Sequence, residues 1–178
     1  MIRRVLLVLA LLGASSHAAD AQMAPDTAAR RAAMDRFAYL VGEWSGDAWA
    51  MVGAGQRVEM RQTEIVRRSL GGQVLLIEGI GRRLVNGEPA DTTFHAVATM
   101  DWEPERGYRM RAYTLVGHAG DFEVRPVEGG FDWTAPAPGG SVLYRMRLTP
   151  DGRWDERGEY QRGDQAYPVV ALDLRKIR

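Results

Sequence analysis

The chain has 178 residues, with 23 basic and 23 acidic side chains and no cysteine. Because neither sign of charge is in excess, the composition does not favour nucleic acid or an anionic membrane surface as a partner. Without cysteine no disulfide can form, so the hydrophobic core alone must hold the fold together. The length suits one domain of ordinary size.

Residues 1–21 have the composition of a secretory signal peptide. Arg3 and Arg4 supply the positive charge, residues 5–12 form an unbroken apolar run, and Ala19–Ala21 is a small-x-small cleavage site. The apolar run is too short to span a bilayer, which argues against the alternative of an uncleaved anchor. We expect Sec-type export to the periplasm or beyond, followed by cleavage and no stable insertion in the membrane.

The mature chain, residues 22–178, is expected to form one domain that opens with a short amphipathic helix. From Thr27 the sequence is rich in alanine, and its larger apolar residues recur at spacings of three and four. Asp26 or Thr27 can cap the helix, because either side chain can accept a hydrogen bond from a free backbone amide. The apolar positions of this predicted helix are Ala33, Met34, Phe37, Leu40 and Val41.

From Trp44 onward the chain becomes a series of short runs with strand character, separated by turn residues. Asn86-Gly87 is the strongest hairpin signal, since both residue types tolerate a positive φ. The predicted strands run from Trp44 to the turn at 53–55, and then over 57–69, 73–85, 92–102, 108–116, 122–127, 131–134, 142–148, 154–161 and 167–175.

About ten antiparallel strands joined by short turns either close into a barrel or leave long edges exposed, and closure removes the edges. A two-sheet sandwich is the alternative, but it needs long crossing connections that this sequence lacks. We therefore predict an all-β fold: an antiparallel up-and-down β-barrel of about ten strands, with the N-terminal helix across one end.

The first predicted strand is entered through Leu40-Val-Gly-Glu-Trp44, and Leu70-Gly-Gly72 follows later. A short helix that leads into Gly-x-Trp resembles the start of calycin-type barrels, the group that holds lipocalins and fatty-acid-binding proteins. The two motifs together are similar to a secreted bacterial family without an assigned function. The resemblance implies structural roles for Gly42 and Trp44, with an arginine of the last strand covering the indole ring; Arg175 has the matching position. An arginine over a tryptophan face forms a cation–π contact.

The sequence predicts no cofactor and no metal centre. Gly42-Glu-Trp-Ser-Gly46 is similar to nitrobindin-like haem barrels, but those barrels carry a late haem-ligating histidine, and no histidine follows His118 here. A metal site needs several converging ligands, and only His95 and His118 remain after the signal peptide.

No catalytic residue is predicted either. The chain contains no Gly-x-Ser-x-Gly, His-Glu-x-x-His, phosphate-loop or dinucleotide-binding motif. Carboxylates are numerous, but none has a catalytic spacing. Enzyme activity stays open, because His95 or a carboxylate that faced a cavity with a shifted pKa could act on a bound ligand.

Strand alternation supplies candidate ligand-binding residues, although it does not say which face of each strand lies inside. One face of the runs 92–102 and 108–116 carries methionines among small residues, which suits an adaptable apolar pocket. The other face carries arginines, which could hold an anionic head group if they point inward, or form ion pairs if they point outward. The candidates on these and a later strand are His95, Met100, Met110, Arg111, Tyr113 and Tyr144.

These patterns favour an exported, non-enzymatic barrel that binds a small hydrophobic or amphipathic molecule. Two other classes remain. One is an enzyme that acts on a small ligand inside the barrel. The other is an envelope interaction or structural protein, whose partner patch would include exposed Trp49, Trp102 or Trp154.

Overall fold

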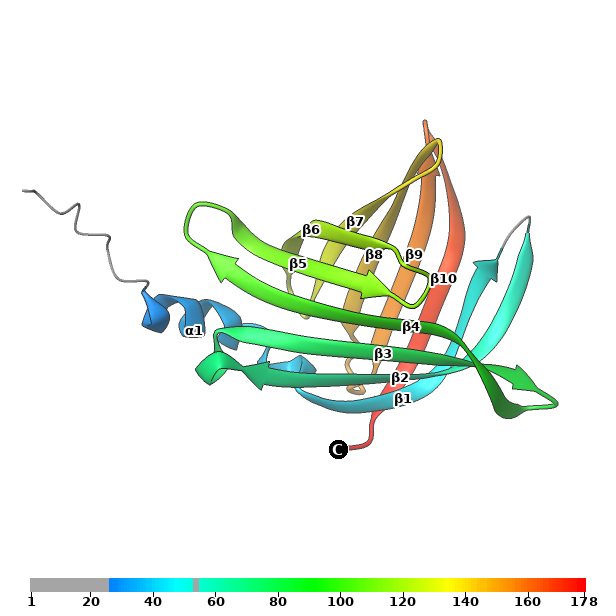
Figure 1. Ribbon diagram of the computed structural model, residues 1–178, viewed down its shortest axis with the longest axis horizontal. Helices are drawn as coiled ribbons and strands as arrows, with labels where there is room; N and C mark the ends of the chain where they lie inside the picture. Colours follow the sequence, from blue (N-terminus) through cyan, green and yellow to red (C-terminus); the bar gives the residue numbers. More distant parts are fainter. Residues whose placement is uncertain (1–25, 53–54) are drawn as a thin grey trace, which may run out of the picture.

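A computed structural model describes residues 26–52 and 55–178, so the predicted signal peptide lies outside the described residues. The described chain forms a closed barrel of ten antiparallel strands, in which each strand pairs with its neighbours in sequence and the last pairs with the first (Figure 1). The predicted all-β barrel with a short N-terminal helix is confirmed. The strands are β1 (Gly42–Val52), β2 (Gln56–Ser69), β3 (Val74–Val85), β4 (Glu88–Glu103), β5 (Gly107–Thr114), β6 (Ala119–Val127), β7 (Gly130–Ala137), β8 (Gly140–Leu148), β9 (Trp154–Arg162) and β10 (Gln165–Lys176).

Several strands extend further than the sequence runs indicated, because the turns between them are tight. Asn86 and Gly87 adopt φ values of 54° and 84°, which reverse the chain within two residues. Pairing therefore resumes at once between Val85 and Glu88, and β4 begins at Glu88 rather than at Thr92.

The N-terminal helix is shorter than its apolar pattern suggested. Helix α1 (Thr27–Asp35) is capped by Asp26, whose Oδ1 accepts hydrogen bonds from the amides of Ala28 and Ala29 at 3.1 and 2.9 Å. The prediction extended it to Val41, but the chain leaves the helix at Asp35 and makes a separate 3₁₀ turn, η1 (Ala38–Leu40), before it enters β1. A second 3₁₀ turn, η2 (Leu70–Gly72), joins β2 to β3.

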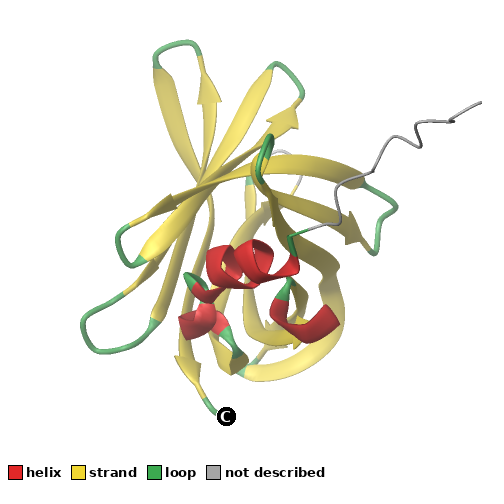
Figure 2. Cartoon of the chain, turned by 90° about the vertical axis from the view of Figure 1, so that its left-hand side faces the viewer, coloured by secondary structure: helices red, strands yellow, loops and turns green. Residues whose placement is uncertain are grey.

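The helix and the turn η1 together close one end of the barrel (Figure 2). Met34, Phe37 and Leu40 have no exposed surface. The Phe37 ring meets Tyr108 and Phe131 edge-on, with centroid distances of 5.2 and 5.8 Å. These apolar side chains fill the end of the barrel, which we call the closed end.

Trp44 links these apolar side chains, which we call the plug, to the barrel wall. Its indole Nε1 donates a hydrogen bond of 2.8 Å to the carbonyl of Leu40, and its ring meets that of Trp154 edge-on at 5.7 Å. Two residues earlier, Gly42 has a φ of 137°, and a Cβ there would lie 2.3 Å from the carbonyl oxygen of Arg178. Only glycine fits at this point of the chain.

The cation over the Trp44 ring is Lys176, whereas the resemblance to calycin barrels implied Arg175. Residues directly opposite on a ladder point to the same face of the sheet, and Trp44 is opposite Lys176 while Arg175 is opposite Ser45. The Nζ of Lys176 lies 5.1 Å from the indole centroid, and Arg175 is exposed.

The other end of the barrel is open. Along β4 the inward-facing side chains change from fully buried Met100 through Ala98 (7% exposed) to Phe94 (40% exposed). On β1 the same gradient runs from buried Trp44 to half-exposed Val52. Figure 1 shows the hairpins diverging at this end. We call it the open end, because solvent reaches the inner wall from there.

No helix within the described residues is long and apolar enough to cross a membrane.

Truncating the plug should cost far more stability than truncating an equally large side chain at the open end. Leu40→Ala removes a fully buried side chain and should lower the free energy of unfolding by about 2–5 kcal/mol. Leu115→Ala, at a leucine that is 63% exposed, is the matched control and should change it by less than about 0.5 kcal/mol. Urea denaturation measures both, and equal effects would contradict the assigned plug.

Candidate functional site

The inner wall of β2 carries two polar side chains where apolar residues are expected. Gln62 and Glu64 lie between Met60 and Val66 on the inward face, and they are 2% and 7% exposed. The Nε2 of Gln62 donates a hydrogen bond of 2.7 Å to Oε1 of Glu64. Burying an ionisable carboxyl is costly, so this pair needs a specific setting.

Two glycines of β3 provide that setting. Gly79 is directly opposite Glu64 on the β2–β3 ladder, and Gly81 is opposite Gln62. A Cβ on Gly79 would lie 2.5 Å from Oε1 of Glu64, and one on Gly81 would lie 2.7 Å from Oε1 of Gln62. The two side chains therefore lie flat across the neighbouring strand, in space that only glycine leaves free.

Glu156 of β9 adds a second inward carboxyl. It shares the inner face of its strand with Trp154 and Gly158, and Nε1 of Trp154 donates a 3.0 Å hydrogen bond to its Oε2. Glu156 is enclosed by the wall but keeps some accessible surface.

Burial shifts the titration of both glutamates upward. It raises the pKa of Glu64 to about 8; the hydrogen bond from Gln62 opposes this rise, and the charge of Glu156 adds to it. Burial likewise raises the pKa of Glu156. At neutral pH Glu64 therefore holds a proton.

An aromatic surface covers the inner wall of β6, β7 and β8. The Trp133 ring stacks on Tyr144 at 3.9 Å with an interplanar angle of 4°, and Phe122 lies 5.0 Å from Trp133 on the other side. Glycines again allow the rings to lie flat, because a Cβ on Gly120 would lie within 3 Å of the Phe122 ring and one on Gly158 would crowd Tyr144 at 3.1 Å. All three rings keep some accessible surface.

Tyr144 connects these three rings, which we call the aromatic wall, to the two inward glutamates Glu64 and Glu156, which we call the carboxyl pair. Burial, aided by the charge of Glu156, raises the pKa of Tyr144 to about 12. Its hydroxyl therefore stays protonated and can donate a hydrogen bond at any physiological pH.

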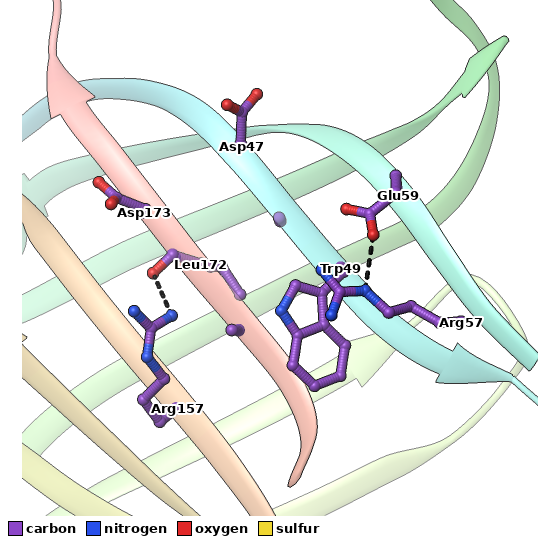
Figure 3. A pocket seen from close by; sticks show the side chains of 9 residues that line it. Asp47, Trp49, Arg57, Glu59, Arg157, Leu172 and Asp173 are labelled. Carbon is purple, nitrogen blue, oxygen red and sulfur yellow. Dashed lines mark hydrogen bonds and ion pairs between the residues drawn. The ribbon is translucent and has the colours of Figure 1, made fainter. Parts of the chain in front are cut away.

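On the outside of the barrel a groove of about 210 Å³ crosses β1, β2, β9 and β10 (Figure 3). Arg57 lies over the Trp49 ring, 4.3 Å from its centroid, and its Nε is 2.6 Å from Oε1 of Glu59. The acids at the other end are also paired, Asp47 with Arg61 at 2.8 Å and Asp173 with Arg153 at 2.7 Å.

Arg157, which completes the groove, pairs with Asp155 at 2.8 Å. Since these charges already have partners on the protein, the groove offers little to a ligand.

The structure divides the six candidate ligand-binding residues between the two sides of the wall. Met100 and Met110 face inward but are buried in the packed half. Only Tyr144 lies with the carboxyl pair.

The other three are on the outer surface, so they cannot line an interior site. Nε2 of His95 lies 3.0 Å from Oε1 of Glu78, and Arg111 pairs with Asp121 at 2.6 Å and donates a hydrogen bond to Tyr113.

The arginines of β8 form outward ion pairs, as Arg111 does. Arg145 lies 2.6 Å from Glu159, and Arg147 lies 2.6 Å from Asp132. Neither points into the barrel to hold an anion.

Sequence reasoning missed Gln62, Glu64 and Glu156. A signal was present on β2, where Met60-Arg-Gln-Thr-Glu-Ile-Val66 places two polar residues on an otherwise apolar face. The matching glycine pair Gly79-Ile-Gly81 on the next strand was a second signal, because glycine inside a strand often marks a close approach of another group. Glu156 had no comparable signal, because its strand reads as mostly polar.

Comparisons with known proteins support the fold and no more. No family model and no curated protein matches the chain. Among solved structures, the crystal structure of Rv2717c from M. tuberculosis matches with a TM-score of 0.61 and 12% sequence identity, over 82% of this chain and 98% of that one. At this identity the match shows a shared barrel architecture.

The stability of the protein should fall as pH rises, because the folded state holds the proton of Glu64 more tightly than the unfolded chain does. Stability is lost between about pH 4.5, the unfolded pKa, and about pH 8, the folded one, and should decrease by roughly 3–5 kcal/mol. Glu64→Gln should reduce this dependence in urea titrations between pH 4 and 9, leaving the part that the raised pKa of Glu156 contributes. Glu128→Gln, at an exposed position, should leave it unchanged; an undiminished slope in Glu64→Gln would assign it to other groups.

Proposed function

We propose that this protein is an exported, non-enzymatic barrel that binds a small hydrophobic or amphipathic molecule in the open half of its interior. The observation that carries the proposal is the row of partly exposed aromatic rings, Phe122, Trp133 and Tyr144, on the inner wall. A barrel built only for stability would bury these rings, since each contributes large apolar area to a core. Ligand pockets combine such apolar surface with a few polar groups, as here.

The apolar residues around the open end, which we call the rim, support entry of a ligand from that end. Exposed apolar side chains lie where the strands end there, among them Val52, Val85, Leu115 and Val116, and Phe94 is exposed further along the inner face of β4. A hydrophobic molecule that approaches this rim meets apolar surface before it reaches the inner wall. Export is the part of the proposal that rests on the signal-like residues 1–21.

Enzyme activity is the second candidate, and one observation favours it. Glu64 is an inward carboxyl whose pKa of about 8 places it in the range that suits a general acid or base at neutral pH. His95, the best candidate from the sequence, is on the outer surface. Conversion of a bound molecule that stops in Glu64→Gln would favour this class over a carrier.

A partner patch built from tryptophans has less support. Trp154 is buried in the core, Trp102 is partly buried beside Tyr108, and Trp49 lies under Arg57. The three do not form one exposed surface.

Blocking the open half should abolish binding of a hydrophobic probe. We expect the neutral dye N-phenyl-1-naphthylamine to gain fluorescence with the wild-type protein at micromolar concentrations. Ala96→Trp places an indole on the inner face opposite Gly79, and it should weaken binding at least tenfold. Val97→Trp puts the same side chain outside on the next residue and should bind like wild type.

Equal binding by Ala96→Trp and Val97→Trp would move the site out of the barrel. If the dye does not bind, and native mass spectrometry of protein from a bacterial periplasm shows only the bare polypeptide, the proposed function fails.

A further inference from the structure

The interior carries two acidic side chains without a balancing cation. Glu64 of β2 and Glu156 of β9 face inward, and neither forms an ion pair with any residue in the part of the chain that the structure describes. The groups around Glu64 are Gln62 of its own strand, Trp44 opposite it on β1 and Gly79 opposite it on β3, and none of them is positive.

Around Glu156 the inner face is equally free of cations. Tyr144 of β8, Trp154 of β9 and Leu172 of β10 are its inward neighbours. The nearby arginines belong to the outer face, where they pair with outer acids, as Arg147 does with Asp132.

Hydrogen-bond acceptors in this cluster also lack donors. Gln62 is 98% buried and uses its amide to donate to Glu64, but within residues 26–52 and 55–178 no group donates to its carbonyl Oε1 or to Oε2 of Glu64. Within the described residues, neither oxygen is among the fully buried side-chain atoms without a partner, so both keep some accessible surface. Oε1 of Gln62, and Oε2 of Glu64 once that carboxyl is ionised, can therefore accept a hydrogen bond from a ligand. The cluster therefore suits a ligand group that is positively charged and rich in hydrogen-bond donors.

The aromatic wall suits the same kind of ligand. Tyr144 lies beside Glu156 and stacks on Trp133, and both rings keep some accessible surface. Exposed aromatic surface next to a carboxylate suits a cation as well as an apolar body. A molecule with a flat apolar body could pack against the accessible part of these rings and reach the carboxyl pair with a polar end.

We propose that the inward pair Glu64 and Glu156, with Gln62 and Tyr144, recognises an organic cation: an ammonium group on a flat apolar body. The inference rests on the proposed function, since it names the class of ligand for the same interior site. In the free protein the proton on Glu64 offsets part of the negative charge; in the complex the ammonium group replaces it.

A ligand series with one body and three head groups tests the idea. Isothermal titration at pH 8 compares 2-naphthylmethylamine, 2-naphthalenemethanol and 2-naphthoate, which are cationic, neutral and anionic. We expect the amine to bind at least tenfold more tightly than the alcohol, and the naphthoate to bind most weakly. Titration of the amine at pH 7 in phosphate and in Tris buffer should show proton release, because a cation lowers the pKa of Glu64.

Variants separate charge from packing. Glu64→Gln and Glu156→Gln keep the size of each side chain, and each should cut the preference for the amine at least fivefold while the alcohol binds within twofold of wild type. Glu128→Gln removes an exposed charge and should change neither affinity. Because each variant is compared through its affinity for the alcohol, a misfolded protein is recognised by loss of both ligands.

Two outcomes overturn the inference. Alcohol that binds as tightly as amine shows that charge is not recognised. A preference for amine that persists in the Glu64→Gln, Glu156→Gln double variant shows that it arises elsewhere. In both cases the neutral naphthyl compound still binds, so the proposed function stands; loss of binding for all three compounds and for the neutral dye would instead remove both.

Discussion

The ladder between β1 and β10 is the constraint on which the rest of the structure depends. It joins the first strand to the last, and so leaves no free sheet edge in the barrel. The same ladder sets Trp44 opposite Lys176, while the indole of Trp44 holds the carbonyl of Leu40 and the edge of Trp154. Closure of the sheet and plugging of one end are therefore achieved by one group of contacts. Because the largest fully buried side chains gather at that end, the opposite half of the interior does not have to be filled for the fold to be stable.

Glycine shapes that second half. On the inner face, Gly79, Gly81, Gly120 and Gly158 each stand beside a larger polar or aromatic side chain that lies across them. Because glycine has no side chain, these positions leave space on the inner wall. Glu64, Phe122 and Tyr144 lie along the wall in this space instead of projecting to the barrel axis. Charge is distributed just as unevenly. The arginines of the strands pair with acids on the outer face, while the two inward glutamates have no cation and shift their pKa values upward instead. The interior is left polar on one side, aromatic on the other, and anionic once Glu64 loses its proton.

Much of the fold follows from local patterns in the sequence. Turn residues at regular spacing predicted ten strands, short connections predicted the up-and-down order, and Asp26 before an alanine-rich segment predicted the helix start. The predictions were wrong where tertiary contacts or tight turns set the bounds of an element. Helix α1 ends before Phe37 because the chain must turn to bring Phe37 and Leu40 into the barrel end, and β4 gains residues because the turn at Asn86 is tight.

The sequence by itself determined which residues share a strand face, since side chains alternate along every strand. It could not determine which face lies inside, and that choice depends on how ten strands close around one axis. Closure put His95, Arg111 and Tyr113 outside, and it brought Gln62, Glu64 and Glu156 together inside from strands about ninety residues apart. The register between strands decided the rest: a shift of one residue separates Lys176 from Arg175, and only pairing with β1 shows which of them lies over Trp44. Local chemistry thus specified the elements, and tertiary closure specified the site.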